Sequence, residues 1–190
     1  LIMVVALSVV TLQLNWIREQ TYLPLLATVG AGSIGLIDDV INIRGLGKGT
    51  AGLKAILKFS LIFLVALIGA FYFYFKLDYN SLAVPFLGQV TLGWFIIPLF
   101  IAVVVATANA VNITDGLDGL AGGLLAIAFG AYAMIAFLQG NYGISAFCVT
   151  IVGTLLSYTW FNVYPARFFM GDTGSFALGT ALGVIAMLTD

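Results

Sequence analysis

Long hydrophobic runs alternate with short polar connections along nearly the whole chain. Most of these runs approach the roughly 20 residues that a helix needs to cross a bilayer. Unpaired backbone N–H and C=O groups are costly in hydrocarbon, and a helix pairs all of them within the segment, so each run is predicted to be a helix. We therefore expect an all-α, polytopic transmembrane helix bundle of about seven helices. The runs are Leu1–Trp16, Leu23–Ile37, Ala55–Phe75, Gly93–Val111, Gly119–Leu138, Tyr142–Phe161 and Ser175–Leu188.

Two features qualify this pattern. The stretch Leu82–Leu92 is punctuated by proline and glycine, which predicts a small hairpin against the membrane surface, on the periplasmic side. The first and last hydrophobic runs are shorter than a full span. We therefore expect residues 1–190 to form a single integral-membrane domain that is truncated at both ends.

The composition excludes a soluble globular protein. Hydrophobic residues make up 62% of the chain and charged residues 8%, against roughly 45–50% and about 25% in soluble domains. Seven basic residues against eight acidic ones leave no basic excess for phosphate backbones, so we expect no nucleic-acid partner. The single cysteine, Cys148, permits no internal disulfide and is expected to be a small buried apolar residue.

Charged residues are distributed unequally between the two predicted membrane faces. Because the connections between spanning helices alternate, residues 38–54, 112–118 and 162–174 share one face. The opposite face receives Arg18, Glu19, Lys76 and Asp78. By the positive-inside rule, the first of these faces is cytoplasmic. It carries five of the seven basic residues: Arg44, Lys48, Lys54, Lys58 and Arg167.

Most carboxylates lie on the same predicted face, each beside a helix end. They are Asp38, Asp39, Asp115, Asp118 and Asp172. Carboxylates near the hydrocarbon boundary lose hydration and repel one another, so they tend to hold a proton or a cation. Mg²⁺ favours one or two carboxylates together with substrate phosphate oxygens, whereas the absence of histidine disfavours zinc.

The first acidic pair, Asp38 and Asp39, is followed by a loop rich in basic residues. This loop can be read as a solvated connector that obeys the positive-inside rule. It can equally be read as a site in which carboxylates serve a metal or a proton transfer and lysines bind phosphate. Lys58 lies deeper in its helix and is interpreted as a snorkelling side chain.

The second acidic stretch places amides and carboxylates three residues apart, at Asn109, Asn112, Asp115 and Asp118. Gly116 and Gly119 predict a break in the helix, which would let these groups converge and free backbone N–H groups for an anion. The simpler alternative is that they cap adjoining helix ends. Gly122 and Gly123 are expected to allow close helix packing.

The third acidic stretch, Asn162–Ser175, joins the last two spans. Asp172 there can cap the final helix, or the helix N-terminus can attract a phosphate. The neighbouring rings of Phe168 and Phe169 fit either an interfacial aromatic belt or stacking on a nucleobase.

Taken in order, these motifs resemble a known enzyme superfamily. They are Ile37–Asp39, Asn109–Leu120 and Phe169–Ser175, and together they resemble the polyprenyl-phosphate N-acetylhexosamine-1-phosphate transferases. The residue sequences of these motifs are most similar to those of the branch that transfers phospho-MurNAc-pentapeptide from its UDP carrier to undecaprenyl phosphate, releasing UMP. The resemblance implies a Mg²⁺-dependent, multi-pass enzyme of the bacterial inner (plasma) membrane with its active site facing the cytoplasm. A relative that uses another UDP-N-acetylhexosamine is the nearest alternative.

The resemblance also implies residue roles. It implies catalytic roles for Asp38, Asp39 and Asp115, metal binding by Asp172, and substrate binding by Lys54, Asn112, Gly116, Asp118, Asn162 and Phe169. Asn42 stands where the superfamily commonly has a lysine. The superfamily's later histidine-rich loop is missing, so we expect this fragment alone to be inactive.

Two alternatives come from other functional classes. An ion-coupled transporter would bring its acids and broken helices to the bilayer midplane rather than to one surface. A noncatalytic scaffold built on glycine-rich packing would leave the aspartates unexplained. The expected partners are UDP-MurNAc-pentapeptide, undecaprenyl phosphate and the lipid bilayer, with a homodimer as a further option.

Overall fold

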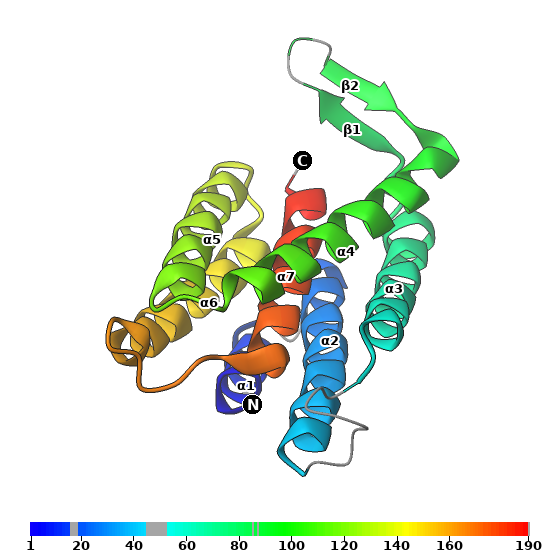
Figure 1. The fold of residues 1–190 in the computed structure, drawn as a ribbon. Helices are drawn as coiled ribbons and strands as arrows, with labels where there is room; N and C mark the ends of the chain where they lie inside the picture. Colours follow the sequence, from blue (N-terminus) through cyan, green and yellow to red (C-terminus); the bar gives the residue numbers. More distant parts are fainter. Residues whose placement is uncertain (16–18, 45–52, 85, 87, 190) are drawn as a thin grey trace.

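A computed structural model describes the chain except for residues 16–18, 45–52, 85, 87 and 190. Arg18 and Lys48, whose membrane faces were predicted above, therefore lie outside the described residues. Within the described part, six helices are long and apolar enough to cross a membrane, and a shorter helix precedes them. The α-helices are α1 (Ile2–Asn15), α2 (Glu19–Ile43), α3 (Ala55–Phe71), α4 (Ile96–Thr114), α5 (Leu120–Leu138), α6 (Tyr142–Asn162) and α7 (Gly171–Leu188) (Figure 1). The predicted all-α membrane bundle is confirmed.

Two helices extend beyond the hydrophobic runs that predicted them. Helix α2 continues past Ile37 to Ile43, and α7 begins at Gly171 rather than at Ser175. Hydropathy falls where polar side chains begin, but the helical backbone continues through them because their partners lie on neighbouring helices. As a result Asp38, Asp39 and Asp172 are helical residues with fixed directions, and not loop residues.

The hairpin predicted for Leu82–Leu92 is confirmed, while its periplasmic placement stays a prediction. Strands β1 (Ser81–Val84) and β2 (Gly88–Thr91) pair antiparallel. They follow a π-helical turn, η1 (Tyr72–Lys76), and precede a 3₁₀ turn, η2 (Gly93–Phe95), and the hairpin projects from one end of the bundle (Figure 1).

Aromatic rings gather where the hairpin joins the bundle. The ring centroid of Trp94 lies 5.4 Å from that of Tyr74 and 5.9 Å from that of Phe75. Such rings are typical of a membrane–water interface.

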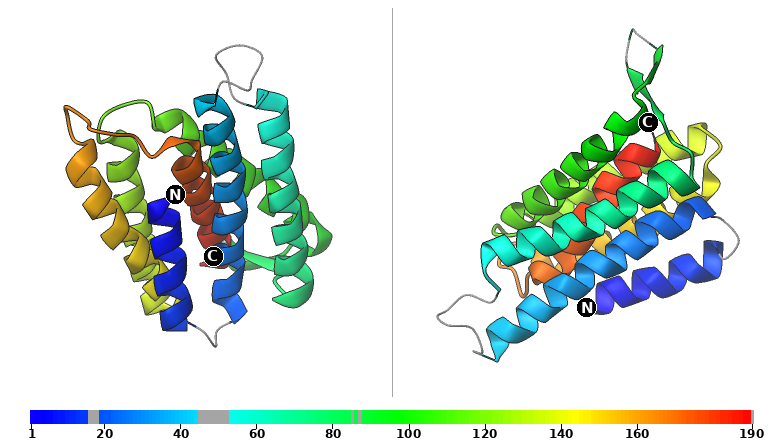
Figure 2. Two further views of the ribbon diagram at one scale, coloured as in Figure 1. Left: turned by 90° about the horizontal axis from the view of Figure 1, so that it is seen from below. Right: turned by 90° about the vertical axis from the view of Figure 1, so that its right-hand side faces the viewer.

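Helix α7 is the centre of the bundle. It packs along α2 and α4 (Figure 2). Most of its residues are buried. Glycines permit this contact: a Cβ at Gly179 would lie 2.7 Å from Cα of Ala108, and one at Gly183 would lie 2.8 Å from Cα of Val104. A Cβ on Gly35 of α2 would overlap the backbone carbonyl of Asp172. Small residues thus let the backbones touch, as they do in other membrane bundles.

The predictions for three other residues are tested by packing. Cys148 is fully buried, as expected. A Cβ at Gly122 would lie 2.7 Å from Oγ1 of Thr159, which confirms its packing role. The same prediction for Gly123 is wrong, because a Cβ there would meet nothing within 4 Å. Successive residues of a helix point in directions about 100° apart, so only one of the two glycines faces α6.

The close approach of α2 and α7 predicts a stability difference between two glycine substitutions. Gly35→Ala should lower the free energy of unfolding by about 1–3 kcal/mol, because the methyl group must push α7 away. Gly123→Ala is the matched control and should be neutral or raise stability by about 0.5–1 kcal/mol, since the helix gains a better helix former. Thermal unfolding in detergent measures both. Equal effects would contradict the packing argument.

Candidate active site

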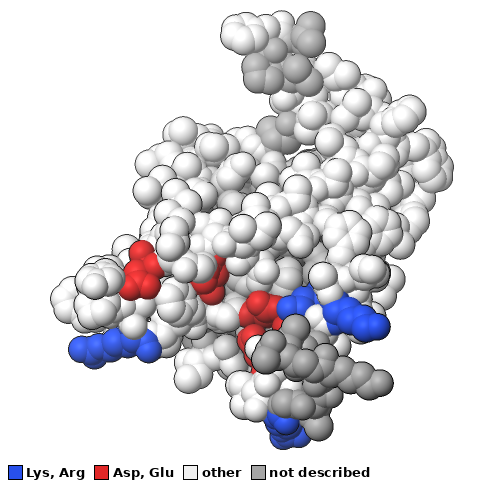
Figure 3. All heavy atoms as spheres, in the orientation of Figure 1, with Lys and Arg blue, Asp and Glu red and all other residues white. Residues whose placement is uncertain are grey.

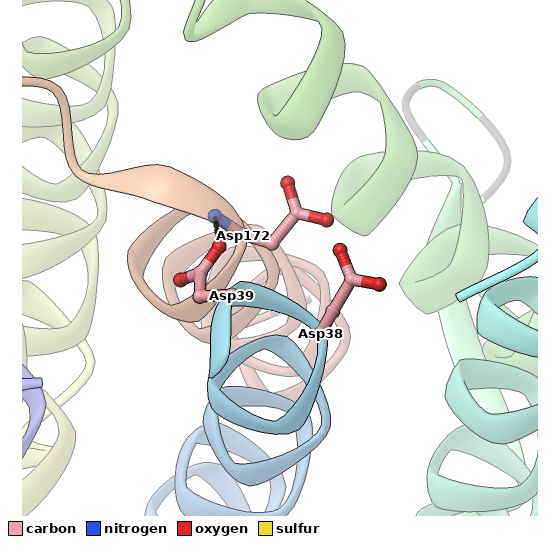
Figure 4. A group of neighbouring side chains, drawn as sticks. All are labelled: Asp38, Asp39 and Asp172. Atoms are coloured by element: carbon pink, nitrogen blue, oxygen red, sulfur yellow. Dashed lines mark hydrogen bonds between the residues drawn. The ribbon is translucent and has the colours of Figure 1, made fainter. Parts of the chain in front are cut away.

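The acidic motifs come together at the end of the bundle opposite the hairpin. Here α2, α4 and α6 end and α3, α5 and α7 begin (Figure 1). Acidic atoms lie across the lower part of the face in Figure 3 with basic atoms beside them, and the described atoms of its upper part are uncharged. One oxygen from each of Asp38, Asp39 and Asp172 lies within 4.8 Å of the others (Figure 4). The predicted convergence of the first and third motifs is confirmed.

Lys58 links two of these carboxylates. Its Nζ lies 2.7 Å from Oδ2 of Asp38 and 2.7 Å from Oδ2 of Asp172. The interpretation of Lys58 as a snorkelling side chain is therefore wrong, because two buried or half-buried acids hold its ammonium inside the bundle. Lys54, which was expected to bind substrate, is an exposed residue one turn earlier, at the N-cap of α3. The two lysines are four residues apart, and the sequence carries no signal that separates the one that meets the acids from the exposed one.

The second carboxylate oxygen of Asp38 and that of Asp172 also accept hydrogen bonds. The backbone N–H of Leu53 donates to Oδ1 of Asp38, which is 3% exposed. Nδ2 of Asn112 donates to Oδ1 of Asp172 at 2.9 Å and to Oγ of Ser175 at 2.9 Å. The carboxylate of Asp172 is thus held between Asn112 of α4 and Lys58 of α3.

Asp39 points at the first turn of α7 and not at Lys58. Its Oδ1 accepts the backbone N–H of Asp172 at 3.2 Å, and its Oδ2 accepts that of Thr173 at 3.0 Å (Figure 4). The hydroxyl of Thr173 donates to the same Oδ2 at 2.6 Å. Met170, the N-cap residue of α7, makes no side-chain capping bond. The alternative in which Asp172 caps this helix is therefore wrong, because Asp172 lies inside the first turn and the capping carboxylate is Asp39 of α2.

The second and third motifs are joined by hydrogen bonds between their loops. Oδ2 of Asp115 accepts the N–H of Gly171 at 3.1 Å, and Oδ2 of Asp118 accepts that of Ala166 at 3.0 Å. Asn162 accepts the N–H of Gly119 at 2.9 Å and donates to the carbonyl of Phe168 at 2.9 Å.

The helix break predicted at Gly116 and Gly119 is present, since α4 ends at Thr114 and α5 begins at Leu120. Gly119 adopts a φ of 73° there, and Gly116 is exposed. Asn109, by contrast, donates to the carbonyl of Val105 in its own helix, at 2.8 Å. Three of the four spaced polar residues therefore converge on the third motif, and the first does not.

Two adjacent phenylalanines have different environments. Phe168 packs between Tyr158 and Phe161, with ring centroids 5.7 and 5.9 Å away. Phe169 is 45% exposed and stacks on no ring in the described part of the chain. Phe168 is also half exposed, at 50%, so the two rings differ in their ring neighbours and not in exposure.

Burial raises the pKa of Asp115 to about 6 from its ordinary value of 3.8, and the charge of Asp172 adds to the rise. The hydrogen bonds from Gly171 and from the hydroxyl of Tyr158, 3.5 Å away, act in the opposite direction and are outweighed. Because the folded pKa exceeds the unfolded one, folding is favoured by protonation of this group. Its contribution to stability is full below the ordinary pKa and is lost as pH rises through about 6.

This shift predicts a titration near neutral pH. In metal-free protein labelled with ¹³C at aspartate carboxyls, one resonance should titrate with a midpoint of about 6 and disappear in Asp115→Asn. The unfolding temperature of the unsubstituted chain should fall more than that of Asp115→Asn as pH rises from about 4 to about 7. A midpoint close to 3.8 would contradict the burial argument.

Comparison with known proteins places this geometry in context. The model of the family described as glycosyl transferase family 4 matches residues 21–190. The chain is 42% identical over 193 aligned positions to a phospho-N-acetylmuramoyl-pentapeptide-transferase of Geobacillus thermodenitrificans, covering 100% of the chain and 58% of that protein. It is 46% identical over 172 positions to the protein of the same name from Anoxybacillus flavithermus, covering 89% of the chain and 52% of that protein.

A third protein of this name, from Clostridium novyi, is 43% identical over 171 positions, covering 89% of the chain and 52% of that protein. The chain thus spans little more than half the length of the curated relatives that it matches. The family match covers nearly all of α2 and every later helix, including the three acidic motifs. The chain belongs to glycosyl transferase family 4.

Proposed function

We propose that the chain carries the active site of a phospho-N-acetylmuramoyl-pentapeptide transferase, which moves the phospho-sugar-peptide from its UDP carrier to undecaprenyl phosphate and releases UMP. The observation that carries the proposal is the cluster of Asp38, Lys58 and Asp172 at one end of an apolar bundle. A site that joins a membrane lipid to a water-soluble nucleotide has to lie at such an end. The relatives' printed names support this choice of donor.

The cluster fits a magnesium ion. Its donors are carboxylate oxygens, which Mg²⁺ prefers. The group contains no histidine or cysteine that would select zinc. The oxygens of Asp38 and Asp172 already bracket one cation, the ammonium of Lys58. Asp172 would hold the metal with Asp38 beside it, and bound Mg²⁺ would supply charge neutralisation at the pyrophosphate.

Lys58 and Asp38 would act on the acceptor lipid. A phosphate monoester has a second pKa of about 6 and is mostly dianionic near pH 7, so the acceptor needs little help in losing a proton. The larger obstacle is the approach of this anion to an anionic pyrophosphate. The Lys58 ammonium can offset that repulsion and orient the attacking oxygen, while Asp38 fixes Lys58 in place.

The donor nucleotide would lie toward the second and third motifs. Phe169 offers an open ring face for the uracil, and Gly116 and Asp118 lie in the adjoining exposed loop. Asn112 is next to Asp172 and so would lie nearer the phosphates. Asn162 would shape this pocket through the loops that it joins, because its amide is already engaged on both sides.

Other predicted roles are retained as proposals. Asp115 would have its catalytic role beside the nucleotide-sugar donor. Its carboxylate also accepts the N–H of Gly171 at the start of α7. The exposed Lys54 would contribute positive charge at the entrance. The basic residues Arg44, Lys54, Lys58 and Arg167 lie at the site's end of the bundle, which supports a cytoplasmic site by the positive-inside rule. A homodimer stays a prediction.

The ion-coupled transporter is less well supported. Asp172 is the second residue of α7, and Lys58 is the fourth of α3. These groups therefore lie within about a turn of the helix ends, whereas a transporter's ion site is expected near the bilayer midplane.

The proposal predicts a large loss of activity from one neutralising substitution. The full chain in bilayers, supplied with UDP-MurNAc-pentapeptide, undecaprenyl phosphate and Mg²⁺, should release UMP, and Asp172→Asn should reduce the rate by about 10²–10³-fold. Asp38→Asn should cost less at pH above 8, since the acceptor is then fully ionised without a base.

Asp78→Asn is the matched control for this assay. Asp78 is exposed in the connection between η1 and β1, and its φ of 57° is one that asparagine tolerates. Its rate should stay unchanged. Faster UMP release from another UDP-N-acetylhexosamine would redirect the proposal to that donor, and equal losses in Asp38→Asn and Asp172→Asn above pH 8 would contradict the ranking of the two aspartates.

A further inference from the structure

The first three backbone N–H groups of α7 are held by carboxylates from other parts of the chain. Asp115 in the loop after α4 accepts from Gly171, and Asp39 of α2 accepts from Asp172 and Thr173. The next N–H, that of Gly174, is bonded within the first turn, to the carbonyl of Met170. A helix N-terminus carries partial positive charge and unpaired donors, so two carboxylates there satisfy both the hydrogen bonding and the charge.

The carboxylate of Asp39 has little capacity left for another partner. Three donors reach its two oxygens, at 3.2, 3.0 and 2.6 Å, and an ionised carboxylate offers about four lone-pair positions. Its neighbour Asp38 instead faces Lys58, so the adjacent acids of α2 point to different partners (Figure 4).

From these contacts we infer that Asp39 is a positioning residue: by capping α7 from α2, it fixes the first turn from which Asp172 reaches the metal, and it binds neither metal nor substrate. The inference rests on the proposed function only where it concerns the metal. It assigns Asp39 a role different from the catalytic one implied by the family resemblance.

The local packing makes this cap effective. Gly35, one turn before Asp39, lets the backbone of α2 touch the carbonyl of Asp172. Gly171 has a φ of 67°, and a Cβ there would lie 3.1 Å from Oδ2 of Asp39. The carboxylate therefore sits where the chain enters the helix, and a change in its hydrogen bonds must shift the backbone that carries Asp172.

Amide hydrogen exchange of the full chain without metal tests the cap independently of transferase activity. Asp39→Asn loses a charged acceptor, so exchange at Asp172 and Thr173 should accelerate about fivefold or more. Thr173→Val keeps the side-chain shape and removes the hydroxyl donor, so it should accelerate the same amides less. Peptides from α5 should not change in either variant, which separates loss of the cap from general unfolding.

Asp118→Asn is the matched control, because it removes an equivalent carboxylate from the N–H of Ala166. It should accelerate exchange at Ala166 and leave Asp172 and Thr173 unchanged. If Asp39→Asn does not accumulate as folded protein, Thr173→Val alone decides, and unaltered exchange of the amide of Asp172 in that variant overturns the inference.

Mn²⁺ binding, followed by electron paramagnetic resonance, then distinguishes positioning from ligation. If Asp39 acts through the cap, Thr173→Val should weaken Mn²⁺ binding severalfold, and Asp39→Asn with Thr173→Val should bind no more weakly than Asp39→Asn alone. If Mn²⁺ binding is lost in Asp39→Asn while Thr173→Val binds normally, Asp39 is a ligand and the inference is wrong. The exchange result stands whether or not the chain proves to be a transferase.

Discussion

The contact between the backbones of α2 and α7 at Gly35 is the constraint on which the site depends. These helices come from distant parts of the chain, and the acids that they carry would repel one another unless the geometry supplied partners. Direct backbone contact places Asp39 against the start of α7 and Asp38 opposite Asp172. Glycines at the α4 contact, Gly179 and Gly183, then fix α7 from its other side. The buried helix thus acts as a rigid support for the chemistry at its N-terminus.

The charges at this end are balanced only in part. Lys58 supplies one positive charge to Asp38 and Asp172 together, and Asp39 is compensated by the N-terminus of α7 rather than by a cation. One unit of negative charge therefore remains between α2, α3 and α7, in partly buried surroundings where charge is costly. A divalent cation would reverse that sign, and anionic substrates would then be attracted. The arrangement explains why acids and a lysine share a site whose proposed substrates are phosphates.

The sequence predicted the helices well because the period and length of apolar runs report directly on the bilayer. It also predicted that Asp38 and Asp172 would meet, because topology alone placed both at one surface. It did not predict the role of Lys58, since a lysine one turn inside an apolar helix looks alike whether it reaches for headgroups or for a buried acid. Nor could it separate Asp38 from Asp39, because adjacent helical residues differ by about 100° in direction, and only the position of α7 shows which one meets its N-terminus.

The location of a bound divalent cation tests the account most directly. Anomalous scattering from Mn²⁺ in crystals of the full chain would show it without reference to activity. The account predicts one strong peak against the carboxylate of Asp172, on the side that faces Asp38, with the carboxylate of Asp39 still bonded to the first turn of α7. A peak held by Asp115 and Asp118 instead, or one coordinated by Asp39 after the cap has opened, would contradict it.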